Sequence, residues 1–349
     1  MQVSVSVTIV LLLNTEAVVP ARVHVVDRIT AERLLKSADL ALYEGKTAGR
    51  DCIRFFTPEM DEALQRRIKL EKIIRDAVAH DGLVLHYQPV FEMANKRLVG
   101  FEALVRLPAP DGALVPPGDF FPLAAEMHLI DKIGTWVLGE ACRTATSWPD
   151  DLTVAVNLSP AQFESGSLED TVANALKTSG LKPHRLELEI LESLLLDNTE
   201  AVMATLKRLK DIGVSIVMDD FGTGYSSLSY LWKFPFDKIK IDRSFMGSFE
   251  KSGHDVETVV KTIIALGREM NMRVTVEGVE TSDQVDFLYD ADADQVQGFY
   301  FGRPMPASQL KGDVFDKIRY SAVVPPDATP RLRVVNPPKE GGGGAGRVG

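Results

Sequence analysis

Several features are scarce in this chain of 349 residues, and each scarcity argues against a class of protein. There are only two cysteines, Cys52 and Cys142, so no disulfide framework is available and a reducing, cytoplasmic compartment is expected. The six histidines never fall at the spacing of paired metal ligands, which argues against a zinc site. Basic residues number 39 and acidic residues 49, so a surface that follows a nucleic-acid backbone is not expected.

Long hydrophobic runs are also scarce. The first apolar run, Val3 to Leu13, is too short to span a bilayer, and it has neither a basic start nor a small-residue cleavage site. We therefore expect no membrane segment and no signal peptide in this chain. Alternation between valine and serine in Val3 to Val7 instead predicts a strand. Hydrophobic residues make up 45% and charged residues 25%, which is typical of globular proteins.

The two ends of the chain predict little independent structure. Residues 1–59 predict a strand at 3–13, a helix from Thr30 to Thr47 and a short strand from Cys52 to Phe56, a small α+β fragment with too little surface to bury alone. Charged residues mixed with apolar ones at helical spacing predict a helical connector at 60–80. From residue 321 to 349 the chain is rich in proline and then glycine, which predicts a disordered tail.

Residues 81–320 alternate regularly between strand and helix patterns. The predicted strands are 83–90, 98–106, 152–158, 185–191, 213–219, 237–242, 272–277 and 294–300. Helical patterns lie between them, for example at 131–148, 168–178, 200–211 and 255–270. Eight such alternations predict an α/β fold, a (β/α)8 barrel of the TIM type. A doubly wound open sheet is the alternative, although no glycine-rich dinucleotide loop supports it.

Two adjacent carboxylates, Asp219 and Asp220, follow the fifth predicted strand, with Gly222 and Gly224 directly after them. Because side chains alternate along a strand, neighbouring carboxylates converge on one object only where the strand breaks. There they repel each other unless a cation lies between them. The pair alone is also compatible with a turn or a helix N-cap, so the choice depends on the rest of the chain.

Every predicted barrel strand carries polar residues opposite its apolar face. In a barrel that second face points inward, and the carboxyl ends of the strands form the mouth where chemistry takes place. The polar residues expected at the mouth are Gln88, Glu102, Arg106, Asn157, Glu189, Asp219, Asp220, Lys240, Glu277 and Gln297. The same faces also carry Glu187, Lys238, Thr275 and Gln295. Carboxylates outnumber cations at the mouth, which predicts hard divalent ions with oxygen ligands, Mg²⁺ or Mn²⁺.

A series of short motifs runs in a fixed order through residues 70–315. They are Tyr87-Gln88-Pro89, Glu102-Ala103-Leu104-Val105-Arg106, Asn157-Leu158-Ser159, Glu189-Ile190-Leu191-Glu192-Ser193, the loop from Asp219 to Ser227, Lys240-Ile241-Asp242, Glu277-Gly278-Val279-Glu280, and Gln297-Gly298 with Phe301. The series resembles that of EAL domains, the cyclic di-GMP phosphodiesterases. The resemblance implies a barrel whose first strand runs antiparallel to the others.

The resemblance to EAL domains also implies a function and a set of site residues. It implies hydrolysis of cyclic di-GMP to linear pGpG with two Mg²⁺ or Mn²⁺ ions, and inhibition by Ca²⁺. The implied ligands of one metal are Glu102, Asn157, Glu189 and Asp219. The implied ligands of the other are Asp219, Asp220 and Glu277. The implied catalytic residues are Lys240, Glu277, Glu192, Glu280 and Gln297, and the implied substrate contacts are Gln88, Leu104 and Arg106.

Several of these implied roles are specific. Lys240 would lie beside the attacking water, with Glu277 as a base, and Glu280 would orient Lys240. Glu192 would brace the loop at 221–227, and that loop would couple the site to the interface of a homodimer formed through the barrel. Non-catalytic cyclic di-GMP receptors, a rival class, usually lack one or more ligands. A third hypothesis is a barrel metalloenzyme that acts on another phosphoester.

Three positions depart from the pattern of EAL domains. Leu191 stands in place of threonine, and His128 and Asp292 stand in place of glycine. None of the three is an implied ligand, so the metal set is complete, and the departures are expected to affect loops.

The N-terminal fragment carries a second resemblance. The stretch from Ala38 to Arg50, followed by Phe55 and Phe56, resembles the C-terminal end of GGDEF domains, the diguanylate cyclases. The signature loop of that family would precede residue 1, so residues 1–59 are expected to be a remnant that makes no cyclic di-GMP.

Overall fold

A computed structural model describes residues 7–12, 18–23, 31–47, 55–195, 199–223 and 231–310, together with 312 and 315. The chain divides into two compact units. One comprises Met1–Val84 and Val105–Trp136, and the other comprises Leu85–Leu104 and Val137–Gly349. The predicted tail at 321–349 lies outside the described residues, as do residues 224–227 of the loop at 221–227.

The first unit contains the N-terminal elements. They are β1 (Val7–Leu12), β2 (Val18–Val23), α1 (Ala31–Thr47), α2 (Pro58–Ala79), β5 (Leu114–Val115) and α3 (Pro117–Glu126). β1 and β2 form an antiparallel pair. The predicted strand at 52–56 lies mostly outside the described residues, and its described end, Phe55 and Phe56, is irregular.

Helix α2 occupies the place of the predicted connector. A proline at its start and Glu59 and Asp61 in its first turn suit the exposed N–H groups and the positive end of the helix dipole. Arg67 forms ion pairs with Glu71 on the same helix and with Glu126 on α3. The helix therefore packs within its own unit through one buried stripe and a few charged contacts.

Eight strands close into a barrel. They are β3 (Val84–Glu92), β4 (Leu98–Pro108), β6 (Thr153–Leu158), β7 (Leu186–Leu191), β8 (Ser215–Phe221), β9 (Lys238–Ile241), β10 (Arg273–Val276) and β11 (Gln295–Val296). Their order is β3-β11-β10-β9-β8-β7-β6-β4, and pairing of β3 with β4 completes the circle. β3 runs antiparallel to β11, whereas β4 and β6 to β11 pair in parallel. The predicted (β/α)8 barrel with an antiparallel first strand is confirmed, and the open sheet is excluded.

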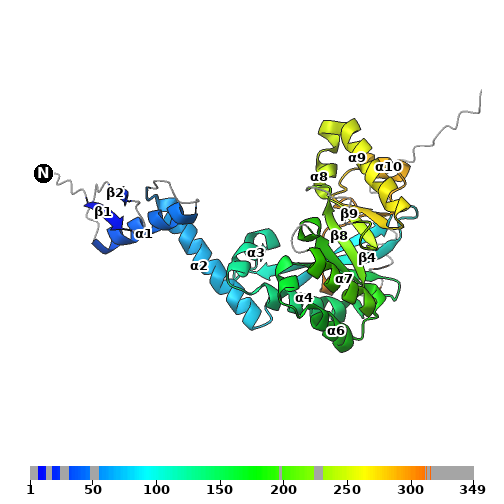
Figure 1. Cartoon of the computed structure of the whole chain (residues 1–349), viewed down its shortest axis with the longest axis horizontal. Coiled ribbons are helices and arrows are strands. Elements are labelled where there is room, and N and C mark those ends of the chain that lie inside the picture. The colour runs from blue at the N-terminus through cyan, green and yellow to red at the C-terminus, as the bar shows by residue number, and fades with distance from the viewer. Residues whose placement is uncertain are drawn as a thin grey trace, which may run out of the picture. The chain divides into compact units, whose positions relative to one another are not determined.

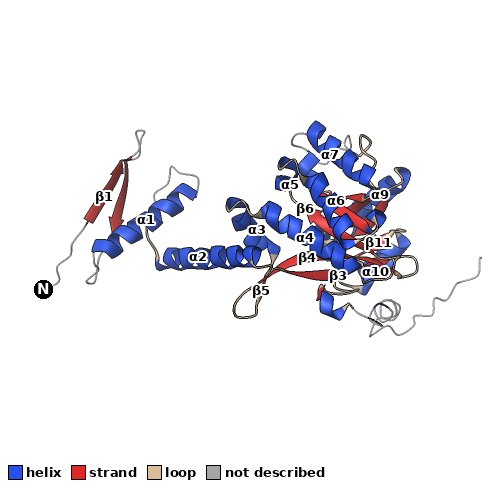
Figure 2. Cartoon of the chain, turned by 90° about the horizontal axis from the view of Figure 1, so that it is seen from below, coloured by secondary structure: helices blue, strands red, loops and turns tan. Residues whose placement is uncertain are grey.

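Helices lie around these strands (Figures 1 and 2). They are α4 (Ile130–Ala145), α5 (Pro160–Glu164), α6 (Leu168–Ser179), α7 (Thr199–Ile212), α8 (Arg243–Gly247), α9 (Phe249–Glu269) and α10 (Ser282–Asp290). Within the described ranges, none of the helices has the length and apolar character needed to cross a membrane.

Strand β7 shows how the sequence builds the barrel wall. Leu186, Leu188 and Ile190 are fully buried on one face, where barrel strands meet their helices. Glu187 and Glu189 alternate with them and are also buried, so they point into the barrel. Both faces of the strand are therefore removed from water, and the charged face supplies the interior.

The eighth strand is shorter than the predicted 294–300. The main chain leaves the sheet after Gln297, whose carbonyl accepts a hydrogen bond from the Val279 N–H at 3.1 Å. A side chain at Gly298 would lie 2.1 Å from the Val279 carbonyl oxygen, so only glycine permits this approach. The segment after β11 is therefore hydrogen-bonded to, and in close contact with, the segment after β10.

Two helix caps fix the chain just beyond the strands of the mouth. The Asp242 carboxylate accepts a hydrogen bond from the Ser244 N–H at 3.0 Å and starts α8 directly after β9. Thr281 and Gln284 form a capping box at the start of α10. These caps hold the segments that follow β9 and β10 in place.

Candidate active site

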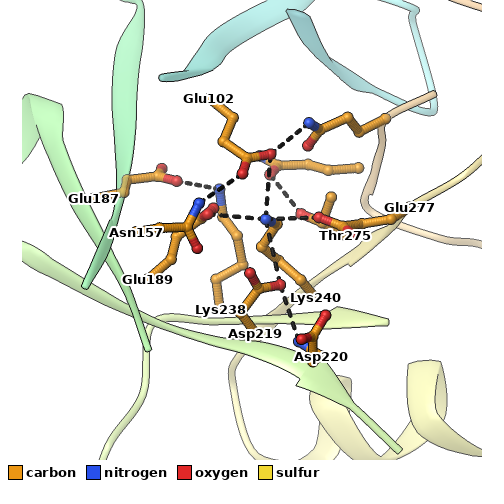
Figure 3. Close-up of polar contacts among 12 residues, drawn as sticks. Glu102, Asn157, Glu187, Glu189, Asp219, Asp220, Lys238, Lys240, Thr275 and Glu277 are labelled. Carbon is orange, nitrogen blue, oxygen red and sulfur yellow. Dashed lines mark hydrogen bonds and ion pairs between the residues drawn. The ribbon is translucent and has the colours of Figure 1, made fainter. Parts of the chain in front are cut away.

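Polar side chains from seven neighbouring barrel strands meet at the mouth of the barrel (Figure 3). They come from the middle of β4, from the carboxyl-terminal halves of β6, β7, β8 and β9, and from the chain just after β10 and β11. The residues are Glu102, Asn157, Glu189, Asp219, Lys240, Glu277 and Gln297. All seven were predicted for the mouth, and hydrogen bonds or ion pairs link them into one network.

Lys240 is the centre of this network. Its ammonium nitrogen, in a side chain that is 2% exposed, lies near four carboxylates. The Nζ–oxygen distances are 2.6 Å to Glu277, 2.9 Å to Glu189, 3.3 Å to Asp219 and 3.5 Å to Glu102. One positive charge therefore faces four acidic groups, of which Glu102, Glu189 and Asp219 are buried and Glu277 is half-buried.

Glu102 is held by two amides as well as by Lys240. Asn157 donates from Nδ2 to one carboxylate oxygen at 2.7 Å, and Gln297 donates from Nε2 to the other at 2.7 Å. The remaining amide oxygen of Gln297 is buried and accepts no hydrogen bond from the described residues. A buried acceptor without a donor is costly, so this oxygen suits a cation or a water.

A break in β8 brings Asp219 and Asp220 together. The pairing of β8 with β9 shifts register between Met218 and Phe221. Asp220 adopts a positive φ of 56°, and its N–H donates to the Asp219 carboxylate at 2.9 Å. Oxygens of Asp219, Asp220 and Glu277 consequently lie within 4.8 Å of one another. The carboxylates predicted to converge where the strand breaks do so.

The pKa values of the acidic side chains at the mouth indicate an excess of negative charge there. Burial raises the pKa of Glu277 to about 8, and burial together with nearby carboxylates holds the pKa of Glu189 well above its usual range. Burial, followed by the charge of Asp219, raises the pKa of Asp220 to about 6. Burial also acts to raise the pKa of Glu102, but Lys240 and the two amides outweigh it and leave that pKa lowered. The site favours additional positive charge.

Glu192 contacts the loop that follows the two aspartates. Its carboxylate is buried and accepts a hydrogen bond from the Gly222 N–H at 3.3 Å. Gly222 has a φ of +93°, and a side chain there would meet the ring of Phe245 at 2.9 Å. This part of the loop therefore has one conformation that glycine alone accommodates.

Other predicted residues lie outside the network. Gln88 donates from Nε2 to the Gly302 carbonyl at 3.3 Å, and Arg106 donates from Nη1 to the Val105 carbonyl at 2.9 Å. Leu104 is half-buried. Glu280 is exposed, and its side chain is not among the ion-pair partners of Lys240 in the described part of the chain. The roles of these four residues stay predictions.

The departures at His128 and Asp292 have a structural explanation. Both residues adopt positive φ values, 54° and 61°, in the region that glycine enters most readily. Asp292 also forms a 2.8 Å ion pair with Arg268. Both are therefore local replacements at turn positions, as expected.

The arrangement corresponds to that of a known family. Residues 71–304 match the family model of the EAL domain. The chain belongs to the EAL domain family. The predicted resemblance is confirmed for this part of the chain, whereas the resemblance of residues 1–59 to a GGDEF domain stays a prediction.

Relatives of this EAL domain include signalling proteins. An uncharacterized signaling protein of Caulobacter vibrioides is 46% identical over 285 residues, which cover 81% of this chain and 35% of the relative. The bifunctional diguanylate cyclase/cyclic di-GMP phosphodiesterase MucR of Pseudomonas aeruginosa is 42% identical over 292 residues, 82% of this chain and 42% of the relative. The chain thus spans between 34% and 42% of the length of the first curated relatives it matches.

Solved structures show the same fold. The PaMucR phosphodiesterase in complex with c-di-GMP superimposes with a TM-score of 0.67 and 44% sequence identity. The match covers 70% of this chain and all of the MucR structure.

Proposed function

We propose that this EAL domain is a metal-dependent phosphodiesterase that opens cyclic di-GMP to linear pGpG in bacterial signalling. The observation that carries the proposal is the network around Lys240, which contains every implied metal ligand except Asp220, and Asp220 donates its N–H to Asp219 beside it. Relatives named as cyclic di-GMP phosphodiesterases and a related structure that holds c-di-GMP support the choice of substrate.

The donor set fits divalent metal ions. It consists of oxygen ligands, which Mg²⁺ and Mn²⁺ prefer. Two features favour the binding of cations at this site. The buried amide oxygen of Gln297 has no donor among the described residues, and the pKa values of Glu189, Asp220 and Glu277 are raised. We assign one ion to Glu102, Asn157, Glu189 and Asp219, and a second ion to Asp219, Asp220 and Glu277.

The protein side chains are assigned separate roles in the reaction. When bound, divalent ions neutralise phosphate oxygens and make water a better nucleophile. Lys240 holds a positive charge where negative charge develops during attack on the phosphodiester. Glu277, with a pKa near 8 and an oxygen 2.6 Å from the Lys240 ammonium, takes the proton from the attacking water. Gln88, Leu104 and Arg106 are assigned to contact the substrate.

A non-catalytic cyclic di-GMP receptor is the second candidate. One observation favours it: Lys240 already binds the carboxylates that the metals require, which would slow turnover if metal binding were weak. The complete ligand set favours the enzyme. A receptor would bind cyclic di-GMP and return it unchanged.

Incubation of the purified chain with cyclic di-GMP separates these candidates. We expect pGpG to accumulate with Mg²⁺ or Mn²⁺ and not with excess EDTA. Binding of cyclic di-GMP without any pGpG, in either metal, would identify a receptor and refute the proposal.

We further infer that the chain forms a homodimer through the barrel and that residues 1–59, which resemble the C-terminal end of a GGDEF domain, make no cyclic di-GMP by themselves. The name of the bifunctional relative MucR supports a link between the two kinds of domain. Light scattering tests the first inference and synthesis from GTP tests the second.

A further inference from the structure

A second buried ion pair lies in the barrel interior, one step away from the mouth. The ammonium of Lys238 on β9 lies 2.6 Å from a carboxylate oxygen of Glu187 on β7. Their side chains are 7% and 11% exposed. Nothing in the proposed reaction uses this pair.

The pair repeats the geometry of the mouth on the same two strands. Lys240 and Glu189, each two residues further along β9 and β7, are joined at 2.9 Å. Both pairs connect β9 to β7 across β8, where Val217 is paired with both Glu189 and Lys238 and is fully buried. The barrel therefore contains two lysine–glutamate pairs two residues apart along the same two strands, Glu187–Lys238 (the lower rung) and Glu189–Lys240 (the upper rung), and both are drawn in Figure 3.

Such a pair is not an efficient way to fill a barrel. Barrel interiors are usually packed with branched apolar side chains, and burying an ion pair costs desolvation free energy that the attraction often fails to recover. The nearby polar side chains Thr275 and Gln295 are hydrogen-bonded to each other at 3.1 Å. The Glu187–Lys238 pair therefore does not share its charges with Thr275 and Gln295 in the contacts described. Because a buried ion pair contributes little to stability, we look for another role for it.

We propose that Glu187 and Lys238 are positioning residues that keep the Lys240 ammonium at the mouth. This inference rests on the proposed phosphodiesterase function. Lysine has a long flexible stem, and the two lysines start only about 7 Å apart along one strand. They are the buried lysines of the described chain. Because Lys238 pairs with the Glu187 carboxylate, Lys240 pairs only with the carboxylates of the mouth among the ion pairs of the described residues.

Removing one member of the lower rung disturbs the upper one. In Lys238→Met, the buried Glu187 carboxylate loses its cation, and Lys240, two residues further along β9, is the other buried lysine of the described residues. Its ammonium is drawn inward, away from Glu277. Since a positioned charge contributes a factor of about 10²–10³ to the rate, partial withdrawal should lower kcat by at least about 10-fold. KM should change little, because the substrate contacts are not altered.

Replacing both Lys238 and Glu187 should return the Lys240 ammonium to its position at the mouth. The double variant Lys238→Met/Glu187→Leu has neither an unpaired carboxylate nor an unpaired ammonium, and apolar replacement of a buried ion pair is often neutral for stability. Lys240 then has no reason to move inward. We expect the double variant to recover kcat to within about 3-fold of the unmodified chain, so that the single change is worse than the double change.

The test compares the unmodified chain, Lys238→Met, the double variant and a matched control. The control is Lys182→Met, which breaks an exposed lysine–aspartate pair with a similar Nζ–oxygen distance of 2.8 Å. The measurements are kcat and KM for cyclic di-GMP with saturating Mg²⁺, with thermal unfolding to confirm folding, and a crystal structure of Lys238→Met. We expect Lys240 to be found on Glu187 in that crystal structure.

Two outcomes overturn the proposal. One is an unchanged kcat in folded Lys238→Met, which would make the rung purely structural. The other is Lys240 in its original place in the crystal structure of Lys238→Met. If the unmodified chain hydrolyses no cyclic di-GMP, the proposed function fails by itself. The position of Lys240 in the crystal structure then decides the positioning role independently of activity.

Discussion

Replacing Lys240 by methionine should slow the enzyme and at the same time tighten its metal binding. The side chains are similar in length, so the change chiefly removes a charge. In the metal-free protein it leaves Glu102, Glu189, Asp219 and Glu277 without the ammonium that each now contacts within 3.5 Å. Leaving a buried charge network uncompensated typically costs about 3–5 kcal/mol of stability.

The effect on metal binding follows from the same contacts. Two like unit charges about 4 Å apart repel each other by about 4 kcal/mol at an effective dielectric constant near 20. The lysine stem moves and the carboxylates change their protonation, so only part of this repulsion will be recovered. We therefore expect Mg²⁺ to bind at least about 10-fold more tightly, equivalent to about 1.4 kcal/mol.

Calorimetry and kinetics measure these effects separately. Titration with Mg²⁺ gives the dissociation constant, and turnover of cyclic di-GMP at saturating Mg²⁺ gives kcat, which we expect to fall by about 10²–10³-fold. Because metal binding stabilises the folded state, Mg²⁺ should also raise the Tm of the variant more than that of the unmodified chain. The exposed variant Lys182→Met should change none of these values. Weaker Mg²⁺ binding in Lys240→Met, or full recovery of kcat in excess Mg²⁺, would refute the reasoning.

Further predictions concern the other residues of the mouth and the N-terminal segment. Asp219→Asn should lower kcat by at least about 10³-fold, because it takes charge from both proposed metal positions, and near-normal kcat would rule out that assignment. Glu192→Ala should weaken Mg²⁺ binding through the lost contact with Gly222, so excess Mg²⁺ should restore part of the rate; equal loss at all Mg²⁺ concentrations would contradict the bracing role. Ca²⁺ should bind but support little turnover, since its larger and looser shell positions water less well, and turnover equal to that in Mg²⁺ would disprove this. Residues 1–349 should form no cyclic di-GMP from GTP, and measurable synthesis would show that the segment at 1–59 has cyclase activity.

The barrel and most of its mouth could be predicted because the sequence pattern has a fixed period. Along β7 and β9, apolar residues alternate with Glu187, Glu189, Lys238 and Lys240, and a period of two assigns these four side chains to one face. Parallel strands end at the same edge, so the last charged residue of each strand could be expected at one mouth.

Other features depended on details that alternation does not encode. The break in β8 shifts the register by local backbone geometry at Asp220, and the glycines that follow signalled a turn without its shape. The early end of β11 follows from the contact of Gly298 with the chain after β10, which is distant in sequence. Pairing of Lys238 with Glu187 also required the order of the strands, because inward-facing residues can choose among several partners. Long-range register was therefore the missing information.

Hydrolysis in isotopically labelled water tests the central claim most directly. If the buried network is a phosphodiesterase centre, cyclic di-GMP incubated with the chain and Mg²⁺ will gain one water and become linear pGpG. The label will appear on the new terminal phosphate, and excess EDTA will abolish the product. Recovery of unlabelled, intact cyclic di-GMP from a chain that binds both the nucleotide and Mg²⁺ would contradict the account.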